Sequence, residues 1–235
     1  MWLKVCGLTR TSEIRLLSSS PVTTVGLWYG VPDGKADLTR DELTTLAGLA
    51  LERGLEPVLV TLLDDPEQLR DAVRASGVRR VQLHGYTTPQ QVAAVRAALP
   101  DVVLLKVLHV RRGKVLEKPF VTAFERAGTD LFLFDSVGDD GRIGSTGKPL
   151  DPAALAPVLD TVRIPFLLAG GLTADAAKEH GAALRHDGFL GIDVDSGARR
   201  PDGTIAPLII DGIRHAWSGE LRRRREELRH AVAVS

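Results

Sequence analysis

Cysteine is nearly absent from this sequence: Cys6 is the only one among 235 residues. A single thiol cannot form an internal disulfide, and it cannot supply the several ligands of a cysteine-rich zinc site or an iron–sulfur cluster. We therefore expect neither a disulfide framework nor a metal held by cysteines. A chain without disulfides is typical of a reducing compartment, so we expect a cytoplasmic protein.

Excess charge of one sign and long apolar runs are also lacking. Lys plus Arg and Asp plus Glu number 30 each, which gives a formal net charge of zero. This balance does not favour a nucleic acid or an anionic membrane as a partner. No stretch approaches the ~18 consecutive apolar residues of a transmembrane helix, and the first residues lack the pattern of a signal peptide. We expect no nucleic-acid partner and no membrane partner.

The sequence does contain a series of short β-rich runs, each followed by a stretch with helical spacing and a turn rich in Gly, Pro or Asp. Several runs are unbroken apolar stretches, which is typical of parallel strands buried on both faces. The predicted strands are Trp2–Cys6, Thr24–Trp28, Pro57–Leu62, Arg80–Leu83, Val102–Leu108, Leu131–Asp135, Pro165–Ala169 and Gly188–Val194.

The segments between these strands begin at residues that favour helix N-caps, namely Thr39, Asp65, Thr88 and Thr173. Repeated βα units that close on themselves form a (β/α)₈ barrel, and a chain with 44% hydrophobic residues can bury one such core. We predict this single-domain barrel over residues 1–215 and a C-terminal helical extension over residues 216–235. The alternative is an open doubly wound sheet. That fold normally begins with a glycine-rich nucleotide turn, which residues 6–9 lack, so we expect no dinucleotide cofactor.

Two ionisable residues end predicted strands: Cys6 ends the first, and Asp135 ends the sixth. On a barrel the C-terminal ends of all strands meet at one rim, so these side chains are candidates for a base and an acid that face one pocket. Lys4 lies two residues before Cys6 on the same strand face and could favour the thiolate. Each candidate has a structural alternative. An unpaired cysteine is often a buried apolar side chain, and Asp135 could cap the following helix.

Other candidate site residues lie in turns at the same rim. The turns at Gly170-Gly171 and Ser196-Gly197 follow the last two strands, where backbone N–H groups form the usual phosphate site of a barrel, although the glycines could simply permit positive φ. Residues 144–148 lack the spacing of a nucleotide P-loop and fit a loop that closes over a small substrate. Gln82 and His84 end the fourth strand, and His84 is equally a candidate for a structural histidine.

Taken together, six motifs resemble phosphoribosylanthranilate isomerases, in chain order up to about Gly212. They are Lys4-Val5-Cys6-Gly7-Leu8-Thr9, Gln82-Leu83-His84-Gly85, Phe134-Asp135-Ser136, Gly144-Ser145-Thr146-Gly147-Lys148, Ala169-Gly170-Gly171-Leu172 and Asp193-Val194-Asp195-Ser196-Gly197. The resemblance implies a (β/α)₈ barrel that performs an Amadori rearrangement in tryptophan biosynthesis, turning N-(5-phosphoribosyl)anthranilate into the corresponding 1-amino-1-deoxyribulose phosphate. It implies no cofactor and no metal, and a small-molecule phosphosugar as the partner of a monomer or homodimer.

The resemblance also implies roles for individual residues. Asp135 is the general acid that protonates the ring oxygen and opens the furanose, and Cys6 is the base that removes the C2 proton of the resulting Schiff base. The phosphate site maps onto the turns at Gly170-Gly171 and Ser196-Gly197. Further substrate contacts are expected from Lys4, Lys35, Gln82, His84, Gly147 and Asp193.

The sequence departs from the family pattern in two places. Ala36 stands where the family carries an arginine that meets the anthranilate carboxylate, so either Lys35 replaces it as a point charge or the non-sugar half of the substrate differs. Asp195 adds a carboxylate that would repel the phosphate unless it points away or pairs with Arg199. Two alternatives stay open: a diverged paralogue that isomerises another aminosugar in specialised metabolism, and a non-catalytic barrel that binds a ligand or a protein.

Overall fold

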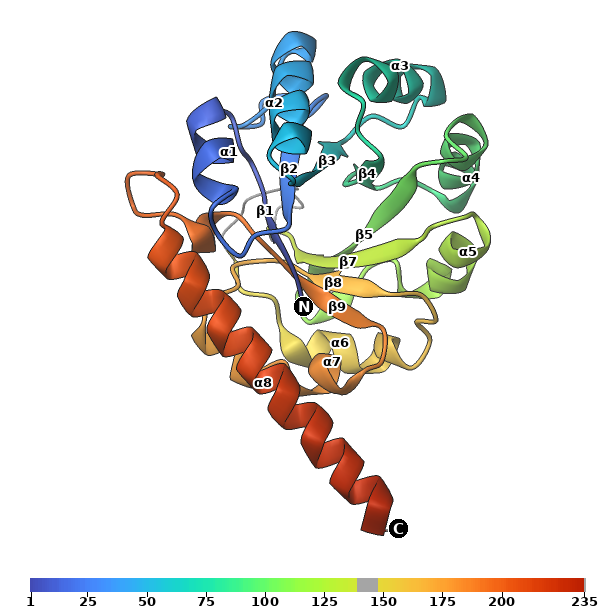
Figure 1. Cartoon of the computed structure of the whole chain (residues 1–235). Helices are drawn as coiled ribbons and strands as arrows, with labels where there is room; N and C mark the ends of the chain where they lie inside the picture. The colour runs from blue at the N-terminus through green and yellow to red at the C-terminus, as the bar shows by residue number, and fades with distance from the viewer. Residues whose placement is uncertain (139–147, 235) are drawn as a thin grey trace.

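Eight parallel strands close into a barrel in the computed structural model, which describes residues 1–138 and 148–234 (Figure 1). The strands pair in the order β1-β2-β3-β4-β5-β7-β8-β9, and β9 pairs back with β1. Their bounds are β1 Trp2–Val5, β2 Thr24–Trp28, β3 Glu56–Thr61, β4 Arg80–Leu83, β5 Val103–Arg111, β7 Leu131–Ser136, β8 Phe166–Leu168 and β9 Phe189–Val194. All the predicted strands are present, so the predicted (β/α)₈ barrel is confirmed.

Helices cover the outside of the barrel (Figure 1). They are α1 Thr11–Leu17, α2 Arg40–Glu52, α3 Pro66–Ser76, α4 Pro89–Ala98, α5 Val121–Arg126, α6 Pro152–Leu159, α7 Gly181–Arg185 and α8 Pro207–Val234, with short 3₁₀ helices η1 Lys118–Phe120, η2 Asp175–Lys178 and η3 Ser196–Ala198. The predicted N-caps Thr39, Asp65 and Thr88 are confirmed, because each side chain accepts hydrogen bonds from backbone N–H groups of the first helical turn.

The fourth predicted N-cap, Thr173, does not begin an α-helix. Its side chain does accept the backbone N–H of Ala176 at 3.4 Å, as an N-cap would. The carbonyl oxygen of Thr173 accepts a hydrogen bond from Trp217 Nε1 at 2.9 Å. The turn that follows is tightened into η2, in which the N–H of Ala177 donates to the carbonyl of Ala174.

A short antiparallel strand, β6 (Lys114–Val115), was not predicted from the sequence. It pairs with the end of β5 through a turn in which Arg112 and Gly113 both have positive φ, at 48° and 72°. Two positive φ values define the hairpin turn that matches the twist of the strands, which normally carries Asn-Gly or Gly-Gly. Arginine at the first position hides that signal. The hairpin carries the chain beyond the rim and returns Glu117 toward β5.

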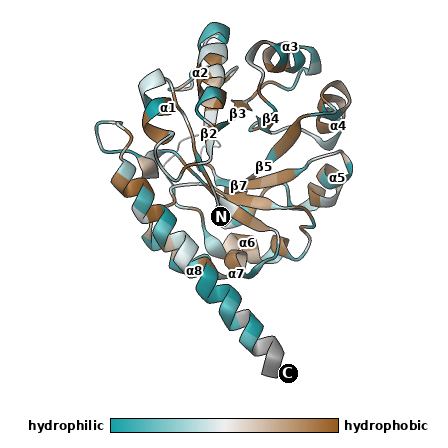
Figure 2. Cartoon of the chain, viewed as in Figure 1, coloured by the Kyte–Doolittle hydropathy of each residue, from teal (hydrophilic) through white to brown (hydrophobic). Residues whose placement is uncertain are grey.

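The core has two layers, which follow from the alternation of side chains along each strand. Inside the barrel, Leu105 and Val107 of β5 pack against Leu131 and Leu133 of β7. The alternate residues face the helices and form the larger outer cluster. Figure 2 shows apolar strands within a ring of helices whose outer faces are polar. The next inward-facing residues toward the rim are polar: His109 follows Val107 on β5, and Asp135 follows Leu133 on β7.

The helix α8 runs unbroken across residue 216 and packs against α7, while its C-terminal half extends away from the barrel (Figure 1). Trp217 fixes it: the side chain is 0% exposed and its ring stacks on Phe189, with centroids 6.4 Å apart. Further along, Arg223 and Arg224 pair with Glu220 and Glu227 on the helix itself. No helix within residues 1–138 and 148–234 is long and apolar enough to cross a membrane.

We expect Trp217→Ala to lower the free energy of unfolding by about 3–5 kcal/mol, because it removes a fully buried aromatic side chain and leaves a cavity. The matched control is Leu208→Ala on the same helix, where the side chain is 84% exposed and the cost should stay below about 0.5 kcal/mol. Urea unfolding followed by circular dichroism measures both. Equal midpoints for the two variants would contradict the docking role of Trp217.

Candidate active site

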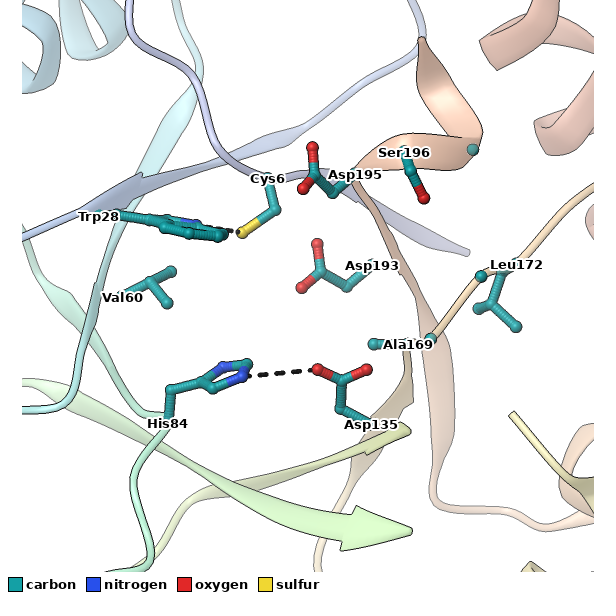
Figure 3. A pocket seen from close by; sticks show the side chains of 13 residues that line it. Cys6, Trp28, Val60, His84, Asp135, Ala169, Leu172, Asp193, Asp195 and Ser196 are labelled. Carbon is teal, nitrogen blue, oxygen red and sulfur yellow. Dashed lines mark hydrogen bonds and ion pairs between the residues drawn. The ribbon is translucent and has the colours of Figure 1, made fainter. Parts of the chain in front are cut away.

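A pocket opens at the C-terminal rim of the barrel, where the ends of the parallel strands meet (Figure 3). The residues that line it come from both sides of the rim: Cys6, Trp28, Val60, His84, Asp135, Ala169, Gly170, Gly171, Leu172, Asp193, Asp195, Ser196 and Gly197. Cys6 and Asp135 lie on opposite sides of this pocket (Figure 3). The predicted acid and base candidates are thus brought to one cavity.

Cys6 follows β1 directly, and its Sγ receives two donors. Trp28 Nε1 donates to the sulfur from 3.2 Å and Lys4 Nζ from 3.3 Å. Gly26 on the neighbouring strand β2 makes room for the thiol, because a Cβ at that position would lie 2.5 Å from Sγ. Both donors would stabilise a thiolate, and Trp28 is a site residue that the sequence analysis missed. Its position at the C-terminal end of β2 was the signal that could have identified it.

Burial nevertheless dominates the protonation of Cys6. It raises the pKa of the thiol to about 11, and the ammonium of Lys4 opposes this only in part. Lys4 is fully buried, and its Nζ lies 2.6 Å from Asp193 Oδ2. Burial alone would lower the pKa of Lys4, but Asp193 and Cys6 raise it above its usual value. Lys4 therefore stays a cation beneath the thiol.

Asp135 ends the inner row of β7, and burial raises its pKa to about 7. The neighbouring Asp193 adds to this rise, while Lys4 opposes it. A carboxyl with a pKa near neutrality can hold a proton and give it away, which suits a general acid. The helix-cap alternative does not apply, because Asp151 caps the next described helix, α6.

His84 faces Asp135 across the pocket floor, with Nε2 3.5 Å from Oδ2 (Figure 3). Gln82 Nε2 lies 2.9 Å from His84 Nδ1 and donates to it, which places the ring proton on Nε2. Burial, and then the nearby charge of His109, hold the pKa of His84 well below its usual value. His84 is thus a neutral ring that presents an N–H to the carboxylate of Asp135.

The two glycine-rich turns border the same pocket. Gly170 and Gly171 both have positive φ, at 91° and 55°. A Cβ at Gly170 would collide with Ser136, and a Cβ at Gly197 would collide with the carbonyl oxygen of Leu172. The glycines are therefore required by close packing and by backbone conformation, and the packing also leaves their backbone at the pocket surface.

Asp195 is compensated on two sides. Its Oδ1 accepts from Arg199 Nε at 3.0 Å, and its Oδ2 lies 2.9 Å from Lys35 Nζ. Arg199 also pairs with Glu13 at 2.8 Å and donates to the carbonyl oxygen of Gly7. Pairing with Arg199 was one of the two ways expected from the sequence to offset the added carboxylate, and the structure shows that pair.

The predicted substrate-contact residues separate into groups. His84 and Asp193 line the pocket, whereas Lys4 and Gln82 are fully buried behind it and contact lining residues. Lys35 lies at the mouth, 54% exposed and joined to Asp195. Gly147 and most of the predicted closing loop fall in residues 139–147, outside the described residues. In the part of the chain that is described, no three His, Cys, Asp or Glu side chains group as metal ligands would.

Three buried polar atoms of this site have no hydrogen-bond partner among the described residues: Gln82 Oε1, His84 Nε2 and Asp193 Oδ1. His84 Nε2 has only the longer contact to Asp135. Buried polar atoms normally have hydrogen-bond partners, so three unpaired ones around a single pocket indicate where a polar ligand binds. Asp193 Oδ1 in particular is available to a hydroxyl.

Comparison with known proteins gives consistent results. The family model of N-(5'phosphoribosyl)anthranilate (PRA) isomerase matches residues 3–204. A relative from Methanosarcina mazei, named N-(5'-phosphoribosyl)anthranilate isomerase 2, is 30% identical over 206 residues, which cover 86% of this chain and 88% of the relative.

Solved structures support the fold. A structure of monomers generated from the dimeric phosphoribosylanthranilate isomerase of Thermotoga maritima has a TM-score of 0.72 at 20% identity. The match covers 93% of this chain and 99% of that one. A phosphoribosyl anthranilate isomerase in complex with reduced 1-(o-carboxyphenylamino)-1-deoxyribulose 5-phosphate has a TM-score of 0.69 at 20% identity with the same coverage.

The raised pKa of Cys6 can be measured directly, because no other cysteine interferes. We expect the rate of alkylation by iodoacetamide to rise about tenfold per pH unit between pH 7 and pH 9.5 without levelling off, since only the thiolate reacts. In urea-denatured protein the rate should level off above about pH 8.5. Trp28→Phe removes a donor to the sulfur, so its rates should fall below those of the wild type. An alkylation rate that levels off near pH 8.5 in the folded protein would contradict the raised pKa of the buried thiol.

Proposed function

The chain belongs to the N-(5'-phosphoribosyl)anthranilate isomerase family, and on that basis we propose that Asp135 and Cys6 carry out the family reaction. The enzyme is an isomerase of tryptophan biosynthesis. It converts N-(5-phosphoribosyl)anthranilate into 1-(2-carboxyphenylamino)-1-deoxyribulose 5-phosphate by an Amadori rearrangement. The single observation that carries the assignment of roles is the placement of a buried carboxyl with a pKa near 7 across one pocket from a buried thiol (Figure 3).

In the first step, Asp135 donates its proton to the oxygen of the furanose ring. The bond between C1 and the ring oxygen breaks, the electron pair of the nitrogen forms the C1=N bond, and a cationic Schiff base results. Asp135 is left as a carboxylate, and the Nε2–H of His84 faces it and stabilises the new charge. This arrangement favours ring opening because the charge that forms meets a fixed donor.

In the second step, the thiol of Cys6 releases its proton to solvent, and the resulting thiolate takes the proton from C2. The cationic nitrogen acidifies that proton, and the same positive charge offsets the burial that otherwise disfavours the thiolate. Trp28 and Lys4 donate to the sulfur. The resulting enolamine gains a proton at C1 and loses the one on the C2 hydroxyl, which gives the ketone. The proton from C2 restores the thiol of Cys6, and Asp135 regains a proton from solvent before the next turnover.

The remaining site residues hold the two ends of a phosphosugar. Backbone N–H groups at Gly170, Gly171, Ser196 and Gly197 bind the phosphate, as is usual for turns after the last two strands of a barrel. Asp193 Oδ1 accepts from a hydroxyl of the substrate, and Lys35 meets the anthranilate carboxylate at the mouth. Asp135, Cys6 and solvent move the protons in this scheme, so it calls for no cofactor. The protein acts as a monomer or a homodimer.

We expect Cys6→Ala and Asp135→Asn each to lower kcat by about 10²–10⁴-fold, because each removes a group that moves a proton in the transition state. Loss of the fluorescent aminoaldose measures turnover. Asp160→Asn is the matched control, because it makes the same carboxyl-to-amide change at an exposed position on the outside of the barrel and should leave kcat unchanged. Near-normal turnover in both site variants, with intact circular dichroism, would sink the assignment.

Lys35 can be tested with two substrates. We expect Lys35→Met to raise KM for N-(5-phosphoribosyl)anthranilate about tenfold with little change in kcat, because a charge contact made equally in the ground and transition states is lost. The corresponding aniline adduct lacks the carboxylate and should show no such change. Lys35→Arg keeps the charge and is the control. An equal rise of KM for both substrates would show that Lys35 does not recognise the carboxylate.

A further inference from the structure

A buried ion pair lies directly beside the candidate acid. His109 continues the inner row of β5 at the level where β7 carries Asp135, and the two residues are register partners. His109 is fully buried, and Glu117, which returns from the β5–β6 hairpin, is nearly so. Glu117 Oε1 lies 2.5 Å from His109 Nδ1, and Oε2 accepts the backbone N–H of His109 at 2.8 Å.

The hydrogen bonds of His109 define its protonation. Its Nδ1 faces a carboxylate oxygen of Glu117, and its Nε2 lies 3.0 Å from the carbonyl oxygen of His84. Both partners can only accept, whereas a neutral imidazole has one N–H. Only the doubly protonated ring donates to both. Burial would raise the pKa of Glu117, but its contacts with His109 outweigh this and lower it, so the pair is an imidazolium and a carboxylate.

The imidazolium clamps the backbone of His84. The N–H of His84 donates to the carbonyl of Thr61 at 2.9 Å, and its carbonyl accepts from His109. Gln82 donates to Nδ1 of the His84 ring, so Nε2 is the only ring nitrogen left to contact the pocket, and it faces Asp135. The ring of Tyr86 covers His109, with centroids 4.4 Å apart. The orientation of His84 is therefore fixed from two neighbouring strands and from the hairpin.

Charges from several elements surround this clamp. Lys4 on β1 and Lys106 and His109 on β5 all disfavour a second proton on His84, as burial does. Asp135 on β7 is the group that His84 faces, and Asp193 and Asp195 add negative charge near it. Glu117 balances His109, with Lys106 nearby. His84 stays neutral in this setting and can act on Asp135 only through its Nε2–H.

We propose that His109 and Glu117 are positioning residues that hold the Nε2–H of His84 on Asp135, where it stabilises the carboxylate formed when Asp135 gives up its proton. The inference rests on the proposed role of Asp135 as the acid. It goes beyond that role, because neither residue of the pair lines the pocket.

The test uses a charge-only variant and a clamp-removal variant. In Glu117→Gln the amide oxygen still accepts the backbone N–H of His109, and the amide nitrogen donates to the ring atom Nδ1. His109 then becomes a neutral ring that keeps the bond from its Nε2 to the carbonyl of His84. The double variant His109→Leu/Glu117→Gln removes the clamp without leaving an unpaired buried carboxylate. We expect the double variant to lower kcat about tenfold with less than a twofold change in KM.

A pH profile separates positioning from simple loss of stability. Turnover needs protonated Asp135, so kcat falls as pH rises through the pKa of that group. Losing the donor to its carboxylate raises this pKa, and the falling limb should move to higher pH in the double variant. The double substitution made in a His84→Asn background should not lower kcat further, because His109 and Glu117 act through His84. Arg96→Gln is the control, because it breaks an ion pair with Asp130 near the opposite end of β7 and should leave the profile in place.

Nitrogen-15 NMR of the histidine rings tests the clamp without substrate. Both ring nitrogens of His109 should carry a proton in the wild type, one of these protons should be lost in Glu117→Gln, and His84 should carry its proton on Nε2. Full additivity with His84→Asn, an unmoved limb in the double variant, or a singly protonated His109 in the wild type would each overturn the proposal. Full activity of Asp135→Asn would instead overturn the proposed acid, while the NMR result on the clamp would still stand.

Discussion

The buried ion pair between Lys4 and Asp193 lies where the barrel closes. The two residues are register partners on β1 and β9, the first and last strands, and their charged atoms are 2.6 Å apart at the floor of the pocket. Removing one partner would leave an uncompensated buried charge, which typically costs about 3–5 kcal/mol. The pair therefore serves two purposes with one contact: it closes the sheet, and it sets the charge beneath the thiol.

The same pair acts on both proposed catalytic groups, in opposite directions. Lys4 lowers the pKa of Cys6 and of Asp135, whereas Asp193 raises both. The two effects oppose each other, and burial then raises both pKa values. The pocket therefore favours the protonated forms of its carboxyl and its thiol. In the proposed mechanism, the positive charge of the Schiff base adds to that of Lys4 in favouring the thiolate.

The placement of Cys6 and Asp135 was accessible from the sequence, because strand ends and one shared rim follow from repeated βα units. Distances across the pocket could not be predicted from the sequence. Alternation along a strand shows which face Trp28 and His109 share, but it does not show that an indole reaches the sulfur or that a ring reaches a carbonyl at the end of the neighbouring strand. The hairpin that supplies Glu117 was missed because arginine occupies a turn position with positive φ. Side-chain partners from distant segments depend on tertiary packing, which no local pattern encodes.

The mouth of the pocket differs from the family pattern, yet its charges balance. Arg199 and Lys35 face the carboxylates of Asp195 and Glu13, so the added Asp195 brings no net negative charge to the turn at Ser196-Gly197. In the proposed phosphate site, the phosphate would meet backbone N–H groups beside a neutral cluster. In the proposed mode of binding, in which Lys35 turns toward a substrate carboxylate, Arg199 would still hold Asp195, because that bond and the one to Lys35 use different carboxylate oxygens. Asp195 can therefore position Lys35 at the mouth and release it without becoming an unpaired charge.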